Sequence, residues 1–164
     1  MKNIFECDDG GIVMCDIRPI ADCPFGYHAY ADGLEIGMLR PACRLESKYL
    51  KIEYFCVRES YRRKSVGRSL MQRFLQDALQ TGCFSEVNVY PYSEPYEGDS
   101  HLDSISLYQA YWKLGFRFAV MTPTDKRELS FDATIAKYAS DCVIPNHHMI
   151  GDIAELIERN NVRR

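Results

Sequence analysis

The segment from residue 58 to residue 70 combines basic side chains with small residues, and this combination can hold an anion. Ser65 and Gly67 would let the backbone approach a phosphate, and a helix N-terminus offers unpaired N–H groups with partial positive charge. Basic residues at a helix start are unfavourable for the helix dipole, and a bound anion would offset this effect. The simpler alternative to an anion site is an ordinary helix start whose basic side chains are solvated. The segment suits a pyrophosphate, with contacts from Arg62, Arg63, Lys64, Ser65, Val66, Gly67 and Arg68.

These residues resemble the pyrophosphate loop of the GNAT superfamily, the Gcn5-related N-acetyltransferases. The family's loop has Arg or Gln, two residues, Gly, one residue, then Gly or Ala. Arg62, Ser65 and Gly67 occupy these positions, with serine in place of the first glycine. The resemblance implies acetyl-CoA (coenzyme A) as cofactor, and we assign to its site the end of the preceding strand, Phe55, Cys56 and Val57.

Residues 107–116 resemble the family's second motif, a helix that bears a tyrosine and is followed by Gly-Phe. The tyrosine corresponds to Tyr111, ahead of Gly115 and Phe116. In the family this residue lies near the cofactor sulfur and can protonate the departing thiolate, so Tyr111 is the candidate general acid. Ser104 stands where the family commonly has an asparagine, and we place it in the cofactor site. A core position is the alternative for Tyr111, because aromatic residues on amphipathic helices are usually packed.

Acetylation of an amine needs a base, because only the neutral amine has a lone pair with which to attack a thioester. Glu53 is the candidate, on the strand that leads to the basic segment. Strand alternation would put Lys51, Glu53, Phe55 and Val57 on one face and so aim the carboxylate at the acyl group. Glu53 could instead be a surface residue or the partner of Lys51. Other groups that could act through a water are Tyr90, His28 and His101.

Residues 92–103 carry four carboxylates, two tyrosines and one glycine between a strand and the Tyr111 helix. Such a loop could attract and orient an ammonium group through charge and ring contacts. An ordinary solvated loop is the alternative. The residues assigned to the acceptor are Glu94, Glu97, Asp99 and Tyr90.

Hydrophobic periodicity and turn residues predict the elements that position these segments. Strands are expected at 12–17, at 27–31 and 34–39 with an Asp-Gly hairpin turn between them, and at 49–57. A helix at 65–81 is followed by a strand around 87–89 and by a helix from 103 or 104 to 114. A strand at 116–121, a short helix at 132–140, a strand at 142–150 and a terminal helix opened by Asp152 and Glu155 complete the pattern.

This order of elements predicts an α/β fold of the GNAT type, with one central mixed sheet flanked by helices. The 164 residues match a single domain, 1–164. The family's usual pair of helices before the second strand hardly fits into residues 1–24, so a shortened N-terminal helical region is expected. The residues after Gly115 and Phe116 form an extended C-terminus. Since these two regions build the acceptor pocket, the resemblance does not identify the acceptor.

The composition argues against several classes of function. Hydrophobic residues make up 46% and charged residues 26% of the chain, and no apolar run is long enough to cross a bilayer. A net charge of -3 argues against a broad surface for nucleic acid. No secretory signal is visible, so the expected location is the cytoplasm. The expected partner is an amine substrate, without nucleic acid or membrane, and a homodimer is left open.

The seven cysteines and four histidines lack the spacing of a metal site. The cysteines are expected to be reduced core thiols, and a catalytic cysteine is the alternative. No metal is expected.

The leading hypothesis is an N-acetyltransferase that moves an acetyl group from acetyl-CoA to a primary amine of a small molecule or peptide. Two alternatives stay open: a catalytically silent acyl-CoA-binding regulatory module, and a toxin-type acetyltransferase acting on aminoacyl-tRNA. The net charge of -3 argues against the toxin-type activity, because RNA binding generally needs a basic surface. Tight CoA binding without turnover would favour the silent module.

Overall fold

The computed structural model describes residues 2–6, 12–139 and 147–160. The strands are β1 (Lys2–Glu6), β2 (Ile12–Pro19), β3 (Tyr27–Ala31), β4 (Leu34–Arg44), β5 (Tyr49–Val57), β6 (Glu86–Val89), β7 (Arg117–Phe118) and β8 (Met149–Asp152). The helices are α1 (Val66–Gln80), α2 (Ser104–Leu114), α3 (Pro123–Glu128), α4 (Phe131–Tyr138) and α5 (Ile153–Asn160), with a 3-10 turn η1 (Glu59–Tyr61).

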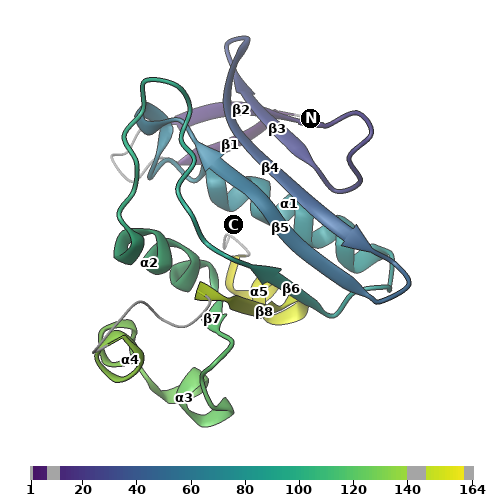
Figure 1. The fold of residues 1–164 in the computed structure, drawn as a ribbon. Coiled ribbons are helices and arrows are strands. Elements are labelled where there is room, and N and C mark those ends of the chain that lie inside the picture. The colour runs from purple at the N-terminus through teal and green to yellow at the C-terminus, as the bar shows by residue number, and fades with distance from the viewer. Residues whose placement is uncertain (1, 7–11, 140–146, 161–164) are drawn as a thin grey trace.

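Within these residues the strands form one sheet in the order β1-β2-β3-β4-β5-β6-β8-β7 (Figure 1). Strands β5 and β6 run parallel, and every other neighbouring pair is antiparallel. The predicted mixed sheet is therefore confirmed. No helix precedes β5 in the described part of the chain, where the antiparallel pair β1 and β2 begins the sheet (Figure 1).

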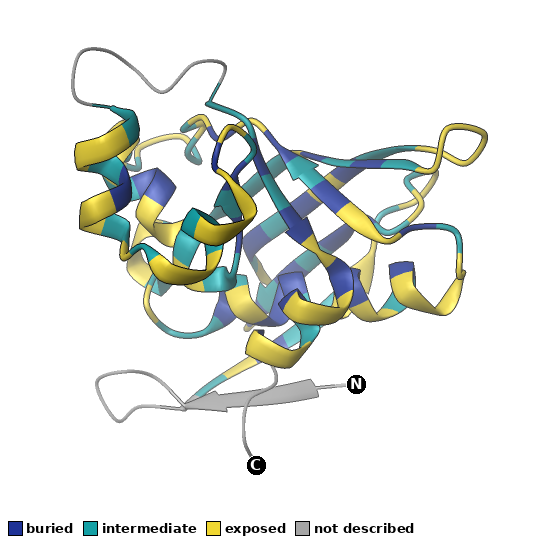
Figure 2. Ribbon diagram, turned by 90° about the horizontal axis from the view of Figure 1, so that it is seen from below, coloured by how far each residue is buried: buried dark blue, intermediate teal, exposed yellow. Residues whose placement is uncertain are grey.

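Helix α1 packs on one face of the sheet, against β3, β4 and β5, and α5 packs beside it. Its buried side contains Val66, Leu70, Phe74 and Ala78, which recur every four residues. Figure 2 shows the same division, with buried residues turned towards the sheet and exposed ones towards solvent. The four-residue spacing predicted this helix because one apolar face is enough to fix it on the sheet.

A β-bulge interrupts the pairing of β4 with β5 at Glu53. Arg40 pairs with Tyr54 and Pro41 with Ile52, so Glu53 has no opposite residue. Pro41 has no N–H to give to the ladder, and proline inside a sheet is found mainly at edges and bulges. The bulge shifts the alternation of β5 by one residue. The prediction that Lys51, Glu53, Phe55 and Val57 share one face is therefore wrong.

Strands β5 and β6 stay together over only two residue pairs, Lys51 with Asn88 and Ile52 with Val89. Strand β5 continues to Val57, whereas β6 ends at Val89 and the chain turns away at Pro91. The two parallel strands therefore separate beyond Ile52, and the loop that follows β6 continues beside β5 in the same direction before the chain returns to α2 (Figure 1). This separation leaves one edge of β5 open towards α2.

The C-terminal part differs most from the prediction. The strand expected at 116–121 is limited to β7, because the chain turns at once, with the Met121 N–H bonded to the Phe118 carbonyl. Helix α3 was missed, although Thr122 caps it and Pro123 opens it. The helix expected at 132–140 is confirmed as α4, and residue 140 lies outside the described residues.

Strand β8 lies between β6 and β7 in the sheet. The strand expected at 142–150 falls partly on residues that are not described, and β8 begins at Met149. The Asp152 carboxylate accepts the Glu155 N–H at 3.0 Å and so caps α5, as predicted. None of the described helices combines the length and apolar character needed to cross a membrane.

Candidate functional site

The N-terminus of α1 has no side-chain cap. Ser65 precedes the helix, but its side chain does not cap it, and no acidic residue lies in the first turn. The first N–H groups of the helix have no intrahelical partners, and the helix dipole adds partial positive charge. Arg63 and Ser65 both have a φ of 61°, in the left-handed region that favours glycine. Ser65 thus adopts the backbone conformation that a glycine would take at this position.

A cleft of about 480 Å³ opens between this helix start, the free edge of β5 and helix α2. It is lined by Phe55, Cys56 and Val57 of β5, by Arg62, Arg63, Ser65, Val66, Gly67 and Arg68 of the basic segment, and by Tyr111 of α2. The structure therefore brings most of the predicted cofactor residues together with the predicted acid. Lys64 and Ser104 do not line the cleft; Lys64 lies over the Tyr61 ring instead, 5.8 Å from its centroid.

Arg62 faces inward from the basic segment. Its guanidinium donates to the Val57 carbonyl at 3.1 Å and to the Ser100 carbonyl at 3.2 Å. It therefore ties the end of β5 to the loop before α2 while lining the cleft. Gly67 keeps the helix close to β5, since a Cβ atom there would lie 3.3 Å from the Phe55 Cζ and 3.5 Å from the Val57 Cγ2.

Tyr111 lies at the inner end of the cleft. It is 6% exposed, and its ring packs edge-on against Phe55 and Phe116 at centroid distances of 6.0 and 5.6 Å. Burial raises the pKa of its phenol well above the ordinary value, and the nearby Tyr92 and Cys56 raise it further. Tyr111 is therefore a core residue and at the same time a neutral phenol at the wall of a cavity. The two roles considered for it are compatible.

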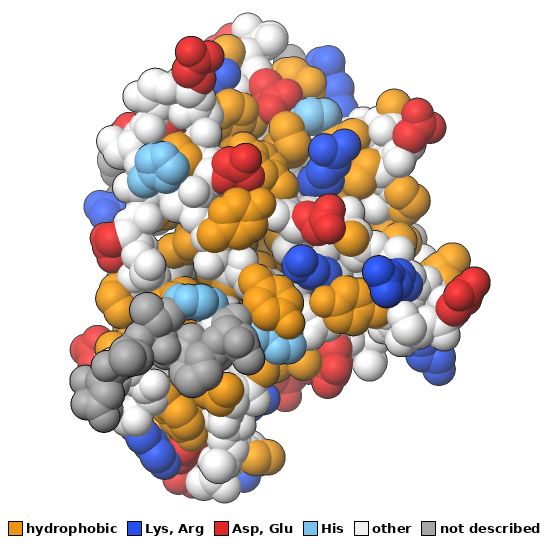
Figure 3. All heavy atoms as spheres, in the orientation of Figure 1, with side chains coloured by type: hydrophobic (Ala, Val, Ile, Leu, Met, Phe, Trp, Pro, Cys, Tyr) orange, Lys and Arg blue, Asp and Glu red, His pale blue; other side chains and the backbone are white. Residues whose placement is uncertain are grey.

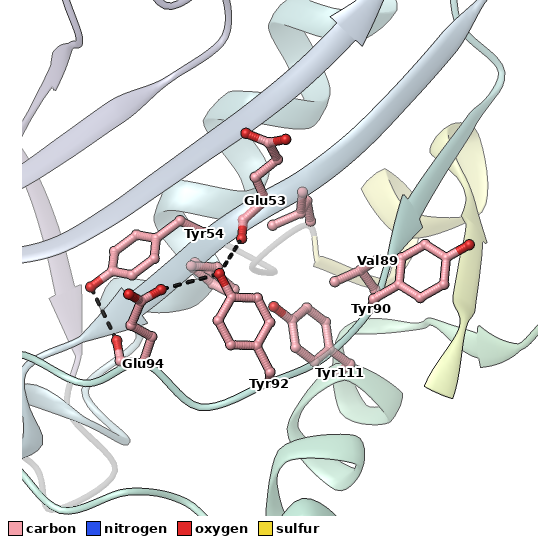
Figure 4. A pocket seen from close by; sticks show the side chains of 9 residues that line it. Glu53, Tyr54, Val89, Tyr90, Tyr92, Glu94 and Tyr111 are labelled. Atoms are coloured by element: carbon pink, nitrogen blue, oxygen red, sulfur yellow. Dashed lines mark hydrogen bonds between the residues drawn. The ribbon is translucent and has the colours of Figure 1, made fainter. Parts of the chain in front are cut away.

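A second, small pocket of about 10 Å³ lies where β5 and β6 separate (Figure 4). Glu53 lines it, but the side chain is exposed and points away from the Tyr92 and Tyr111 hydroxyls, while its backbone carbonyl faces Tyr92. Glu94 also lines it, and its carboxylate faces the Tyr92 hydroxyl at 3.1 Å. The sequence counted Tyr92 among the loop tyrosines that could contact an ammonium group, but it did not predict the position of Tyr92 beside Tyr111, because that position depends on the path of the loop after β6.

The other predicted acceptor residues have different surroundings. The Asp99 carboxylate accepts the Glu59 N–H at 2.9 Å and so fastens the loop to η1. Glu97 is exposed and lines neither cavity. Tyr90 lines the small pocket, but its ring stacks on His148 at 4.6 Å, and the Lys51 ammonium lies 5.3 Å from its centroid.

The groups considered for a water relay are spread apart. His28 lies 3.0 Å from a Glu35 carboxylate oxygen on β3 and β4, and His101 is exposed; neither lines either cavity. Among the described residues, no group of His, Cys, Asp and Glu is arranged to hold a metal ion. The five described cysteines are free: Cys15 is buried in the core, Cys43 and Cys83 are half-buried and pack against it, and Cys23 and Cys56 are half-buried.

The sheet face opposite α1 carries a mixture of hydrophobic side chains, histidines and charges of both signs (Figure 3). No single sign of charge dominates the part of this face that Figure 3 shows.

The left-handed backbone at Ser65 leads to a testable prediction. Ser65→Gly should be more stable than Ser65→Ala by about 1 kcal/mol, because both variants lack the hydroxyl and only alanine keeps the cost of the left-handed conformation. Differential scanning calorimetry should show a melting temperature higher by about 2–4 °C for the glycine variant. Equal melting temperatures, or a more stable alanine variant, would show that position 65 carries no such strain.

The chain is similar in sequence and in fold to known proteins. The sequence profile of the acetyltransferase (GNAT) family matches residues 5–116, more than half of the chain. The fold is similar to that of GCN5 from Tetrahymena, with a TM-score of 0.51 and 11% identity, over 78% of this chain and 67% of that chain. It is also similar to a GNAT-family acetyltransferase from Staphylococcus aureus Mu50, with a TM-score of 0.50 and 14% identity, over 79% of this chain and 69% of that chain.

PaiA N-acetyltransferase from Thermoplasma acidophilum, solved in complex with coenzyme A, aligns with a TM-score of 0.46 and 17% identity. The alignment covers 60% of this chain and 54% of that one, so the similarity spans little more than half of that protein. The comparison with curated proteins gives no match.

Proposed function

Because the chain belongs to the acetyltransferase (GNAT) family, we propose that it transfers an acetyl group from acetyl-CoA to a primary amine of a small molecule or peptide. The observation that carries this proposal is the convergence of the uncapped α1 N-terminus and the buried Tyr111 phenol on one cleft. One end of the cleft suits an anion, and the other holds a proton donor.

The residues at the outer end fit the diphosphate of coenzyme A. The first N–H groups of α1 point out of the helix without intrahelical partners, and Arg63 and Arg68 add positive charge beside them. Gly67 leaves the backbone free of a side chain where α1 packs against Phe55 and Val57 of β5. Along the inner part, the open edge of β5 offers backbone groups that β6 does not pair beyond Ile52.

Bound acetyl-CoA supplies an activated acetyl carbon and a thiolate leaving group. Tyr111 would donate its proton to the departing sulfur, and the raised pKa keeps the phenol protonated through the neutral range. A carboxylate at the small pocket would take the proton of the amine, and both Glu53 and Glu94 line that pocket. The packed rings of Phe55 and Phe116 hold Tyr111 in one orientation.

Thiol release measured with a panel of amines tests the proposal. The panel contains spermidine, an Nα-blocked lysine, phenethylamine, glutamate and a short peptide with a free N-terminus. At least one amine should raise thiol release above the rate with acetyl-CoA alone. CoA binding without stimulation by any amine would favour the silent regulatory module, and acetylation of aminoacyl-tRNA alone would favour the toxin-type activity.

A further inference from the structure

Glu94 lies where the two cavities meet. Four residues line both the large cleft and the small pocket: Phe55, Tyr92, Glu94 and Tyr111. The small pocket, at about 10 Å³, has room for one group of the size of a water molecule or an ammonium group. A nitrogen placed there would have the Glu94 carboxylate and the Tyr111 phenol among its surroundings (Figure 4).

The backbone of Glu94 is fixed across the free edge of β5. The Tyr54 hydroxyl donates to the Glu94 carbonyl at 3.0 Å. Further along the loop, Tyr96 donates to a Glu35 carboxylate oxygen at 2.7 Å. The loop that carries Glu94 is therefore held to β4 and β5, and Glu94 keeps its place although its side chain is exposed to solvent.

The Tyr92 hydroxyl has two acceptors and one proton. It lies 3.2 Å from the Glu53 carbonyl and 3.1 Å from a Glu94 carboxylate oxygen (Figure 4). An ionised Glu94 competes with the carbonyl for that single proton. If Glu94 gained a proton, it could donate to the Tyr92 oxygen while Tyr92 donated to the Glu53 carbonyl. The arrangement thus has a hydrogen-bonded place for one additional proton.

The two neighbouring phenols do not compete for that proton. Partial burial and the contact with Glu94 raise the pKa of Tyr92, and burial raises that of Tyr111, so both phenols stay neutral in the neutral range. The Glu53 side chain points away from them, and Asp99 is bonded to the Glu59 N–H (Figure 4).

We propose, on the basis of the amine acetylation proposed above, that Glu94 receives the ammonium group of a cationic acceptor and takes its proton. The Tyr92 hydroxyl holds the Glu94 carboxylate in place for this role. The half-buried ring of Tyr54 and the exposed ring of Tyr92, which also line the pocket, can contact the same cation. The acceptor class is therefore amines without a carboxylate beside the reacting nitrogen, since such a carboxylate would lie close to Glu94.

The proton balance is complete. Glu94 takes one proton from the ammonium and later releases it to solvent. The neutral nitrogen then forms a bond to the acetyl carbon while the carbon–sulfur bond breaks. Tyr111 gives its proton to the sulfur, and its phenol is restored by the second proton that the nitrogen loses on becoming an amide.

The test uses the full-length protein and the panel amine with the highest turnover. Glu94→Gln should lower kcat/KM for that amine by about tenfold, since water can replace part of the lost base, with CoA affinity within about twofold of wild type. The matched control is Glu46→Gln, an exposed glutamate in the turn between β4 and β5 that lines neither cavity and should leave kcat/KM unchanged. Glu53→Gln is measured beside them.

A binding measurement separates recognition from rate. Calorimetry of the same amine with CoA-saturated protein should show weaker binding to Glu94→Gln and to Tyr92→Phe than to wild type, with the difference shrinking at high salt. If the wild type is active, three results would overturn this inference alone. They are an unchanged kcat/KM in Glu94→Gln, a larger loss of kcat/KM in Glu53→Gln than in Glu94→Gln, and a preference for glutamate as acceptor. No acetylation by wild type would overturn the proposed function as well.

Discussion

Gly67→Asp should weaken CoA binding by about a hundredfold or more. The substitution places a carboxylate at the start of α1, where the uncapped N–H groups and basic side chains would face the diphosphate. Repulsion between a carboxylate and a phosphate in contact is worth roughly 3 kcal/mol near a protein surface, about two factors of ten in Kd. Isothermal titration calorimetry with CoA measures the effect.

Two further variants separate charge from shape. A Cβ atom at position 67 would lie 3.3 Å from the Phe55 Cζ, so any side chain there needs a small shift of that ring. Gly67→Ser carries the same added Cβ without the charge and should lose much less affinity. Gln76→Asp adds the same charge on an exposed position of α1 and should bind CoA as wild type does. Unchanged affinity in Gly67→Asp would remove the helix start from the cofactor site.

Tyr111→Phe should lower kcat by about one to three orders of magnitude and leave CoA affinity nearly unchanged. The phenylalanine ring keeps the contacts with Phe55 and Phe116, so the change removes the hydroxyl and little else. Loss of the proton donor makes the thiolate a poorer leaving group. Steady-state kinetics with the best amine, together with calorimetry for CoA, separates the two quantities.

The matched control is Tyr108→Phe, one turn earlier on α2. Tyr108 is buried like Tyr111, but its hydroxyl bonds to His147 and does not line either cavity. This variant should retain turnover when corrected for any loss of folded protein. Equal loss of CoA binding and turnover in Tyr111→Phe would instead make Tyr111 a packing residue without a chemical role.

Local signals in the sequence predicted the elements that position the cleft. The Asp32-Gly33 turn between β3 and β4 takes positive φ at both residues, 49° and 79°, which this residue pair tolerates. Asp103 caps α2 through the Ser106 N–H, and Gly115 ends it at a φ of 114°. These features depend on residues close together in the chain, so a single sequence is sufficient to find them.

The prediction that the Glu53 carboxylate points at the acyl group depended on regular pairing between strands. Period-two alternation holds only while two strands stay in register, and the bulge opposite Pro41 breaks it at Glu53. A proline within an otherwise regular strand was the available signal. The position of Tyr92 and Glu94 in the small pocket that Tyr111 also lines depends on the path of the loop after β6 along β5, which several long-range hydrogen bonds determine. No local pattern encodes that path.

The most direct test of acetyl transfer follows the acetyl group itself. Acetyl-CoA labelled with ¹³C at the carbonyl is incubated with the protein and the best amine of the panel, and the carbonyl signal is followed by NMR. The expected result is loss of the thioester signal and growth of an amide signal in equal amount, with both changes slowed in Gly67→Asp and in Tyr111→Phe. Conversion of the label only to free acetate, or no conversion with any amine although CoA binds, would contradict an N-acetyltransferase function.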